Sequence, residues 1–182
     1  MEHLTEQRAE YVTLPESLLK ALYKLQKEPR DYEWGGGIDF EIINDEPQVE
    51  RILAYFGEQG KMPSRILEKY RGDVEVMFHT HPNQNKVQPS AGDLMSFLAS
   101  PAQVEFIIAS EEIGMLEKTH DFEEKRGTWE YVMMPKHYDP KQTMPGIIRA
   151  LKAIGIDVSL YPKSTASPVF DLNIIRQITE KK

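Results

Sequence analysis

Two histidines and an acidic residue stand close together in the middle of the chain, within residues 79–93. His79 and His81 occupy alternate positions, Ser90 follows a short polar segment, and Asp93 comes three residues later. Two neutral imidazole nitrogens and one carboxylate oxygen are suitable ligands for a catalytic zinc ion (Zn2+), and they leave a fourth position for water. The residue types and their spacing therefore predict a metal centre.

A β-strand is expected to carry both histidines. Apolar side chains alternate along 74–79, which is the period of a strand with one face packed on a core. His79 and His81 fall together on the other face, where they are close enough to share one ion. Pro82 biases His81 toward extended backbone, so strand geometry should continue through the second histidine.

A loop and a helix are expected to bring the carboxylate back to the histidines. Residues 83–89 are polar and end in proline, which is typical of a loop. A helix should begin after Ser90, because Ser90 and Asp93 have the spacing of a capping box, although Asp is less usual there than Glu or Gln. The positive end of the helix dipole also favours a carboxylate in the first turn. Its apolar face would consist of Leu94, Phe97 and Leu98.

The composition limits the classes of protein to consider. The 182 residues suit a single domain with a substantial core. There are no cysteines, so disulfides, thiolate zinc sites and cysteine-protease chemistry are excluded, and hydrolysis must use activated water or a hydroxyl. The net charge of −7 argues against nucleic acid as a partner.

Neither a membrane-spanning segment nor a secretory signal is evident. No apolar run approaches the roughly 20 residues that cross a bilayer, and the first residues lack a basic region followed by an apolar stretch. We therefore expect a cytoplasmic protein without a membrane partner.

The rest of the chain has the alternating elements of an α/β protein. Helices are expected over 14–28 and 63–70, from 147 to a stop at Gly155, and, more weakly, from Val169 onward. Strands are expected over 37–43, 49–55, 104–109, 115–119, 129–134 and 156–161, with turns at 44–47 and 121–127. The run 104–109 is almost wholly apolar, which is typical of a buried central strand.

The order His-x-His-Pro, seven residues, Ser, two residues, Asp resembles the signature of the JAMM (MPN-plus) zinc metalloproteases. The resemblance implies that His79, His81 and Asp93 bind zinc and that Ser90 helps to stabilise a tetrahedral intermediate. It also implies an α/β fold with a mixed sheet flanked by helices, similar to cytidine deaminases. The small size looks more like bacterial, archaeal or phage members than large eukaryotic ones.

The similarity covers about residues 14–135 of a single JAMM-like domain spanning 1–182. Residues 136–182 would form an extension of helix and strand without a motif that we can assign.

A glutamate is required upstream in this family, in a Glu-x-x-Gly pattern at the start of a strand. Glu33 and the glycines that follow match it, which implies that Glu33 is the general base. Phe40 departs from the family, which often has a small residue there. The alternative for Glu33 is a solvated strand face shared with Asp39 and Glu41.

Family members cleave after the C-terminal glycines of ubiquitin-like or sulfur-carrier proteins, so the resemblance implies a zinc-dependent peptidase or isopeptidase with such a substrate. Two alternatives remain open. One is a zinc hydrolase of a small amide or a deaminase-like substrate, although known zinc deaminases use cysteine ligands, which this chain lacks. The other is a non-catalytic binding module, although every ligand position is filled here.

Overall fold

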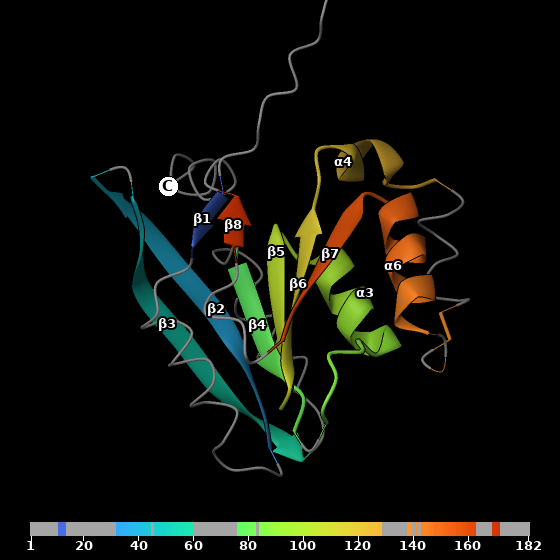
Figure 1. The fold of residues 1–182 in the computed structure, drawn as a ribbon, viewed down its shortest axis with the longest axis horizontal. Coiled ribbons are helices and arrows are strands. Elements are labelled where there is room, and N and C mark those ends of the chain that lie inside the picture. The colour runs from blue at the N-terminus through green and yellow to red at the C-terminus, as the bar shows by residue number, and fades with distance from the viewer. Residues whose placement is uncertain are drawn as a thin grey trace, which may run out of the picture.

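The computed structural model describes residues 11–13, 32–44, 46–59, 76–82, 84–128, 138–139, 141, 143–162 and 169–171. These residues form a mixed β-sheet with helices, which confirms the α/β class (Figure 1). Among them, no helix is both long and apolar enough to span a membrane.

The main sheet has six strands in the order β3-β2-β4-β5-β6-β7. Its strands are β2 (Tyr32–Ile43), β3 (Glu46–Gln59), β4 (Val76–Thr80), β5 (Val104–Ile108), β6 (Glu112–Lys118) and β7 (Ile156–Pro162). The helices are α3 (Ala91–Ala99), α4 (Asp121–Lys125) and α6 (Met144–Ala153). Two short strands, β1 (Tyr11–Thr13) and β8 (Val169–Asp171), form a separate antiparallel pair.

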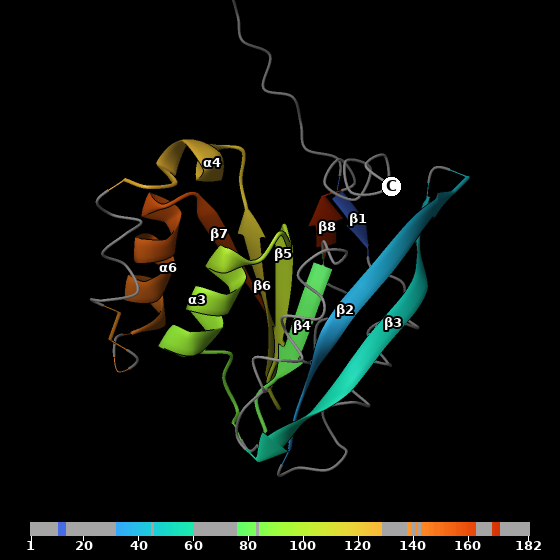
Figure 2. The same ribbon diagram turned by 180° about the vertical axis from the view of Figure 1, so that it is seen from behind.

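The only parallel pairing among the described strands joins β4 to β5, and it explains where α3 lies. Parallel neighbours need a crossover, because the chain must return to the end of the sheet from which it came. α3 makes this crossing on one face of the sheet (Figure 2). The N-terminus of α3 therefore follows the carboxyl end of β4, the end at which open α/β sheets commonly bind ligands.

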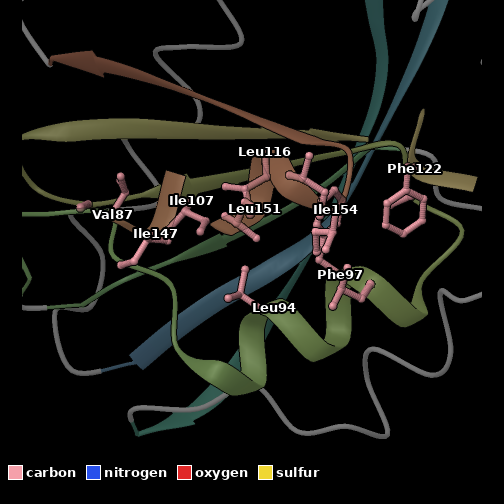
Figure 3. Close-up of a cluster of buried hydrophobic side chains, with 13 residues drawn as sticks. Val87, Leu94, Phe97, Ile107, Leu116, Phe122, Ile147, Leu151 and Ile154 are labelled. Atoms are coloured by element: carbon pink, nitrogen blue, oxygen red, sulfur yellow. The ribbon is translucent and has the colours of Figure 1, made fainter. Parts of the chain in front are cut away.

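An apolar cluster between the sheet and the helices α3 and α6 holds this arrangement together (Figure 3). Leu94 and Phe97 from α3 meet Ile147 and Leu151 from α6, and Ile107 lies beneath them on β5. All five side chains are at most 1% exposed. Burying a large apolar side chain contributes roughly 1.5–3 kcal/mol, so α3 is held firmly against the sheet.

Several expectations are confirmed. β4, α3 and β5 form where the sequence predicts them, and every residue of β5 is buried between β4 and β6. β3 covers the expected strand 49–55, is longer at both ends, and pairs with β2.

α6 and β7 also form near their predicted positions, and they belong to the same cluster and the same sheet as the preceding elements. α6 ends before Gly155, whose φ of +79° is a left-handed conformation that suits glycine. A Cβ at Gly155 would also lie 2.6 Å from the backbone nitrogen of Phe122.

Two expectations are wrong. The segment 121–127 is not simply a turn, because Asp121–Lys125 form α4, which buries Phe122 in the apolar cluster. Val169–Asp171 form β8 rather than the start of a helix, because Tyr11–Thr13 provide an antiparallel partner for their backbone. The helices expected over 14–28 and 63–70 and the strand expected over 129–134 lie outside the described residues.

Candidate metal centre

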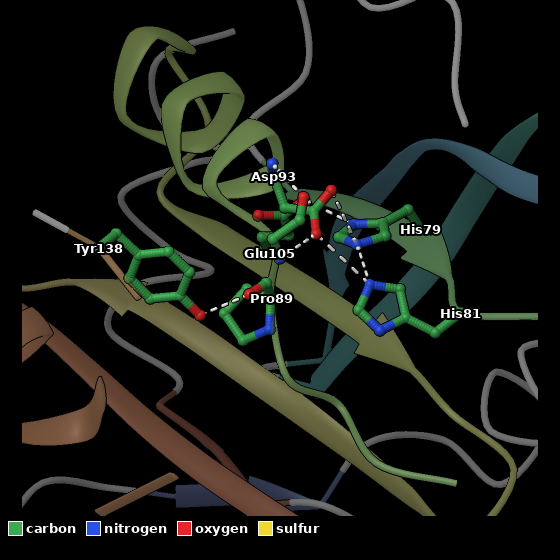
Figure 4. A network of polar contacts seen from close by, with 7 residues as sticks. His79, His81, Pro89, Asp93, Glu105 and Tyr138 are labelled. Carbon is green, nitrogen blue, oxygen red and sulfur yellow. Dashed lines mark hydrogen bonds and ion pairs between the residues drawn. The ribbon is translucent and has the colours of Figure 1, made fainter. Parts of the chain in front are cut away.

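Three side chains converge at the carboxyl end of β4. His79 Nε2 lies 3.0 Å from His81 Nε2 (Figure 4). Asp93 places Oδ1 at 3.7 Å from His79 Nε2 and Oδ2 at 3.5 Å from His81 Nε2. The structure thus brings together the two histidines and the aspartate that the sequence singles out, as a group that could hold one metal ion.

These separations fit tetrahedral coordination. With metal–ligand bonds of about 2.0–2.1 Å, two ligand atoms of a tetrahedral zinc site lie roughly 3.3 Å apart. The three separations of 3.0–3.7 Å bracket this value. The two distances to Asp93 involve different oxygens, and one ligand atom of each side chain lies within 4.8 Å of the others, so a shift of the side chains would let a single ion bind all three.

The backbone of β4 positions both imidazoles. Side chains two residues apart on a strand project from the same face, and the extended conformation continues past the end of β4. The His81 amide donates a 2.9 Å hydrogen bond to the Ile108 carbonyl, so pairing with the β5 side of the sheet extends to His81. Both histidines are buried, with 6% and 7% of their surface exposed.

A reciprocal cap at the start of α3 positions the carboxylate. The Ser90 amide donates to Asp93 Oδ2 at 2.6 Å, and the Asp93 amide donates to Ser90 Oγ at 3.1 Å. The predicted capping box is therefore present, with aspartate in the acidic position. Because Ser90 Oγ accepts this hydrogen bond, its own hydroxyl hydrogen remains able to donate to another group.

The site stabilises positive charge. Burial disfavours the charged form of His79, but the carboxylates of Glu105 and Asp93 outweigh it and raise the His79 pKa well above its usual value. Burial likewise opposes ionisation of Asp93, yet hydrogen bonds from His79, His81 and Ser90 hold the Asp93 pKa far below its usual range. This donor set is chemically suited to a cation, which would replace the proton on His79.

Glu33 lies beside this group, near the start of β2. The β2–β4 register pairs Gly35 with His79, and Glu33, at an irregularity of β2 between Tyr32 and Trp34, is close enough to interact electrostatically with His79 and Asp93. Only 8% of its surface is exposed, which rules out a solvated strand face for Glu33. Burial, reinforced by Asp93 and Glu105 and opposed by His79, raises the Glu33 pKa to about 7. The structure describes the backbone of Asp39, Phe40 and Glu41 within β2 but not their side chains.

Two further residues contact the site without having been singled out from the sequence. Glu105 Oε1 lies 2.9 Å from His79 Nδ1. The Tyr138 hydroxyl donates to the carbonyl of Pro89, immediately before Ser90, and burial together with nearby Asp93 raises the Tyr138 pKa to about 12. A lone carboxylate within the apolar run 104–109 is the sequence signal that could have identified Glu105. No sequence pattern identifies Tyr138 as a residue of the site.

The loop between the ligands is anchored to the sheet. The Ser110 amide donates to the Gln84 carbonyl at 2.9 Å, and the Val87 amide donates to Glu112 Oε1 at 3.1 Å. Val87 is 1% exposed and packs against Gly114, where a Cβ would come within 2.9 Å of it. The described residues 84–90 therefore have a defined path that delivers Ser90 to the start of α3.

No protein-family model matches this chain, and no curated protein matches it significantly. The case for a metal centre therefore depends on the side chains themselves.

Proposed function

We propose that this protein is a JAMM-type zinc peptidase or isopeptidase that cleaves after the C-terminal glycines of a ubiquitin-like or sulfur-carrier protein. The observation that supports the proposal most directly is the convergence of His79, His81 and Asp93 on one point, with Glu33 buried beside them. The reaction would be hydrolysis of an amide bond, with water as the nucleophile.

A zinc ion held by the three ligands would supply Lewis acidity and lower the pKa of a water molecule to about 7. Glu33 is suited to take a proton from the attacking water and to return it to the departing amine. A carboxyl whose pKa is about 7 in the metal-free protein is suited to both steps, because a general acid–base catalyst is most effective when its pKa is near the working pH. The carbon–nitrogen bond breaks as this proton reaches the amine.

Ser90 is suited to stabilise the oxyanion that develops on the carbonyl oxygen. Its Oγ is fixed by the hydrogen bond from the Asp93 amide, so its hydroxyl hydrogen can point away from α3 without loss of the cap. A preorganised donor of this kind stabilises charge that appears only in the transition state.

The glycines of β2 favour a substrate segment that has no bulky side chains next to the metal site. Gly35 pairs with His79, and Gly37 lies two residues further along on the same face. Neither carries a side chain that would project beside the histidines. A tail ending in two glycines would suit a narrow site, because it adds no side chains of its own.

The direct test uses the zinc-loaded protein and two fusions of a ubiquitin-like protein to a reporter amine. One fusion retains the C-terminal Gly-Gly, and the other has Val-Val in its place. We expect cleavage of the Gly-Gly fusion alone, loss of cleavage when zinc is removed with a chelator, and recovery when zinc is added back.

Hydrolysis of small amides and binding of the fusion are measured in parallel with the cleavage assay. Hydrolysis of small amides without cleavage of the fusion would favour a small-molecule hydrolase. Tight binding of the fusion by folded, zinc-loaded protein without any cleavage would favour a binding module, and either result would contradict the proposal.

A further inference from the structure

We propose that Glu105 is a positioning residue for the metal ligand His79 and that its buried carboxylate offsets part of the charge of a bound dication. The inference builds on the proposed function, since it concerns the same metal centre, but it adds a residue outside the JAMM signature. It follows from the contacts of Glu105 on the neighbouring strand β5.

The Glu105 carboxylate is in direct contact with the imidazole of His79. Glu105 Oε1 lies 2.9 Å from His79 Nδ1, and the two side chains are 2% and 7% exposed (Figure 4). The parallel register pairs Met77 with Glu105, so Glu105 rises from the same face of the sheet as His79. The carboxylate therefore reaches the back of the imidazole, away from the metal position.

This contact determines which nitrogen of His79 can bind an ion. A carboxylate accepts a hydrogen bond from Nδ1–H, so the neutral ring carries its hydrogen on Nδ1 and its lone pair on Nε2. Nε2 is the atom that faces His81 and Asp93. A carboxylate behind a histidine ligand fixes the ring orientation and makes the ligand nitrogen more basic.

The second observation is the incomplete pairing of Glu105. Within the part of the chain that the structure describes, Glu105 Oε2 is buried and has no hydrogen-bond partner. Glu112 on β6, which is also buried, uses both oxygens: Oε1 accepts from the Val87 amide, and Oε2 lies 3.5 Å from Lys86 Nζ. Leaving a buried carboxylate with a single partner is costly unless positive charge is nearby.

Lys118 already interacts electrostatically with Glu105, and a bound dication would add further positive charge on the side of His79. When His79 and His81 are neutral ligands, the carboxylates of Asp93 and Glu105 together balance two positive charges, and Glu33 is then free to take up and release a proton. Without Glu105 the site would lose one of the negative charges that offset a bound dication. Glu105 therefore serves both the geometry and the charge of the site.

The test measures zinc affinity directly, by competition with a chromophoric chelator at fixed pH, so it does not depend on activity. Wild type is compared with Glu105→Gln, Glu105→Ala and the control Glu112→Gln. We expect Glu105→Ala to weaken zinc binding by about 10–100-fold. Glu105→Gln keeps an acceptor but loses the charge, so its affinity should fall between those of Glu105→Ala and wild type. Glu112→Gln keeps the oxygen that accepts from the Val87 amide, so the loop stays anchored and the zinc affinity should stay within about 2-fold of wild type.

A spectroscopic readout distinguishes positioning from simple stabilisation of the fold. In zinc-loaded wild type, NMR should show a slowly exchanging His79 Nδ1–H, and this signal should be lost or strongly shifted in Glu105→Ala. Unchanged zinc affinity in folded Glu105→Ala, or in Glu105→Gln if the alanine variant does not fold, would overturn the inference. If wild type itself bound no zinc, the metal centre and with it the proposed function would fail instead.

Discussion

Two carboxylates reach the same centre from different parts of the fold, and their environments differ. Glu33 comes from β2, where burial raises its pKa to about 7. Asp93 comes from the N-terminus of α3, where hydrogen bonds from both histidines and from the Ser90 amide keep its pKa far below the usual range. At neutral pH, Asp93 is therefore permanently ionised, whereas Glu33 can gain or lose a proton.

The contrast teaches that the partners of each carboxylate, more than its residue type, assign the role. Hydrogen bonds from the two imidazoles and from the Ser90 amide favour the ionised form of Asp93. A buried strand position lacks such donors, so the neutral form is favoured until a partner approaches. Two carboxylates whose environments separate their pKa values are a common arrangement for an acid–base group beside a permanently charged one.

The largest expected effect comes from replacing each carboxylate by its amide. Asp93→Asn removes a charged ligand, so zinc binding and turnover should both fall below detection. Glu33→Gln removes only the proton carrier, so zinc binding should persist while turnover falls by roughly 10²–10⁴-fold. Zinc content by mass spectrometry and cleavage of the Gly-Gly fusion measure the two properties separately. If Glu33→Gln lost its zinc, Glu33 would be a metal ligand, and the difference in role between Glu33 and Asp93 would be contradicted.

A smaller effect is expected at Ser90, which belongs to the Asp93 side of the site. As an N-cap alone, Ser90→Gly should cost only a few tenths of a kcal/mol of folding stability. If its hydroxyl also stabilises the oxyanion, turnover should fall by roughly 100–1000-fold. Thermal unfolding measures the change in folding stability, and single-turnover cleavage measures the change in turnover. Unchanged turnover in folded Ser90→Gly would remove Ser90 from the mechanism.

The smallest effect is a pH dependence of stability in the metal-free protein. The folded-state pKa of Glu33, about 7, is raised above the ordinary value of 4.5, so the folded state holds a proton that the unfolded chain releases. The stability that Glu33 contributes is complete below pH 4.5 and is lost as the pH rises to about 7. Glutamine has no titratable group, so Glu33→Gln lacks this pH dependence of stability.

The melting temperature of wild type should therefore fall relative to Glu33→Gln between pH 4.5 and 7. A change of several degrees is expected, because each kcal/mol moves the melting temperature of a domain this size by roughly 2–4 °C. Scanning calorimetry in the presence of a chelator measures the difference. A difference that did not change with pH would show that Glu33 is not held in its protonated form.

The parts of the site that depend on local pattern could be predicted from the sequence. The alternation before His79, the proline after His81 and the capping residues Ser90 and Asp93 each act over a few residues, and β4, α3 and the cap form as predicted. Short-range periodicity and capping were sufficient because they depend on neighbours in the chain. The strand β8, in contrast, depends on pairing with β1 at the other end of the chain, and the local pattern gave the wrong prediction there.

The residue types and spacing of His79, His81 and Asp93 were thus enough to indicate a metal centre. The tertiary structure alone decided that Glu105 stands behind His79, that Glu33 is buried beside the triad, and that Tyr138 supports the loop at Pro89. These contacts join residues 26 or more positions apart in the chain or depend on the register between strands. Burial and electrostatic coupling follow from such packing, and no local pattern encodes them.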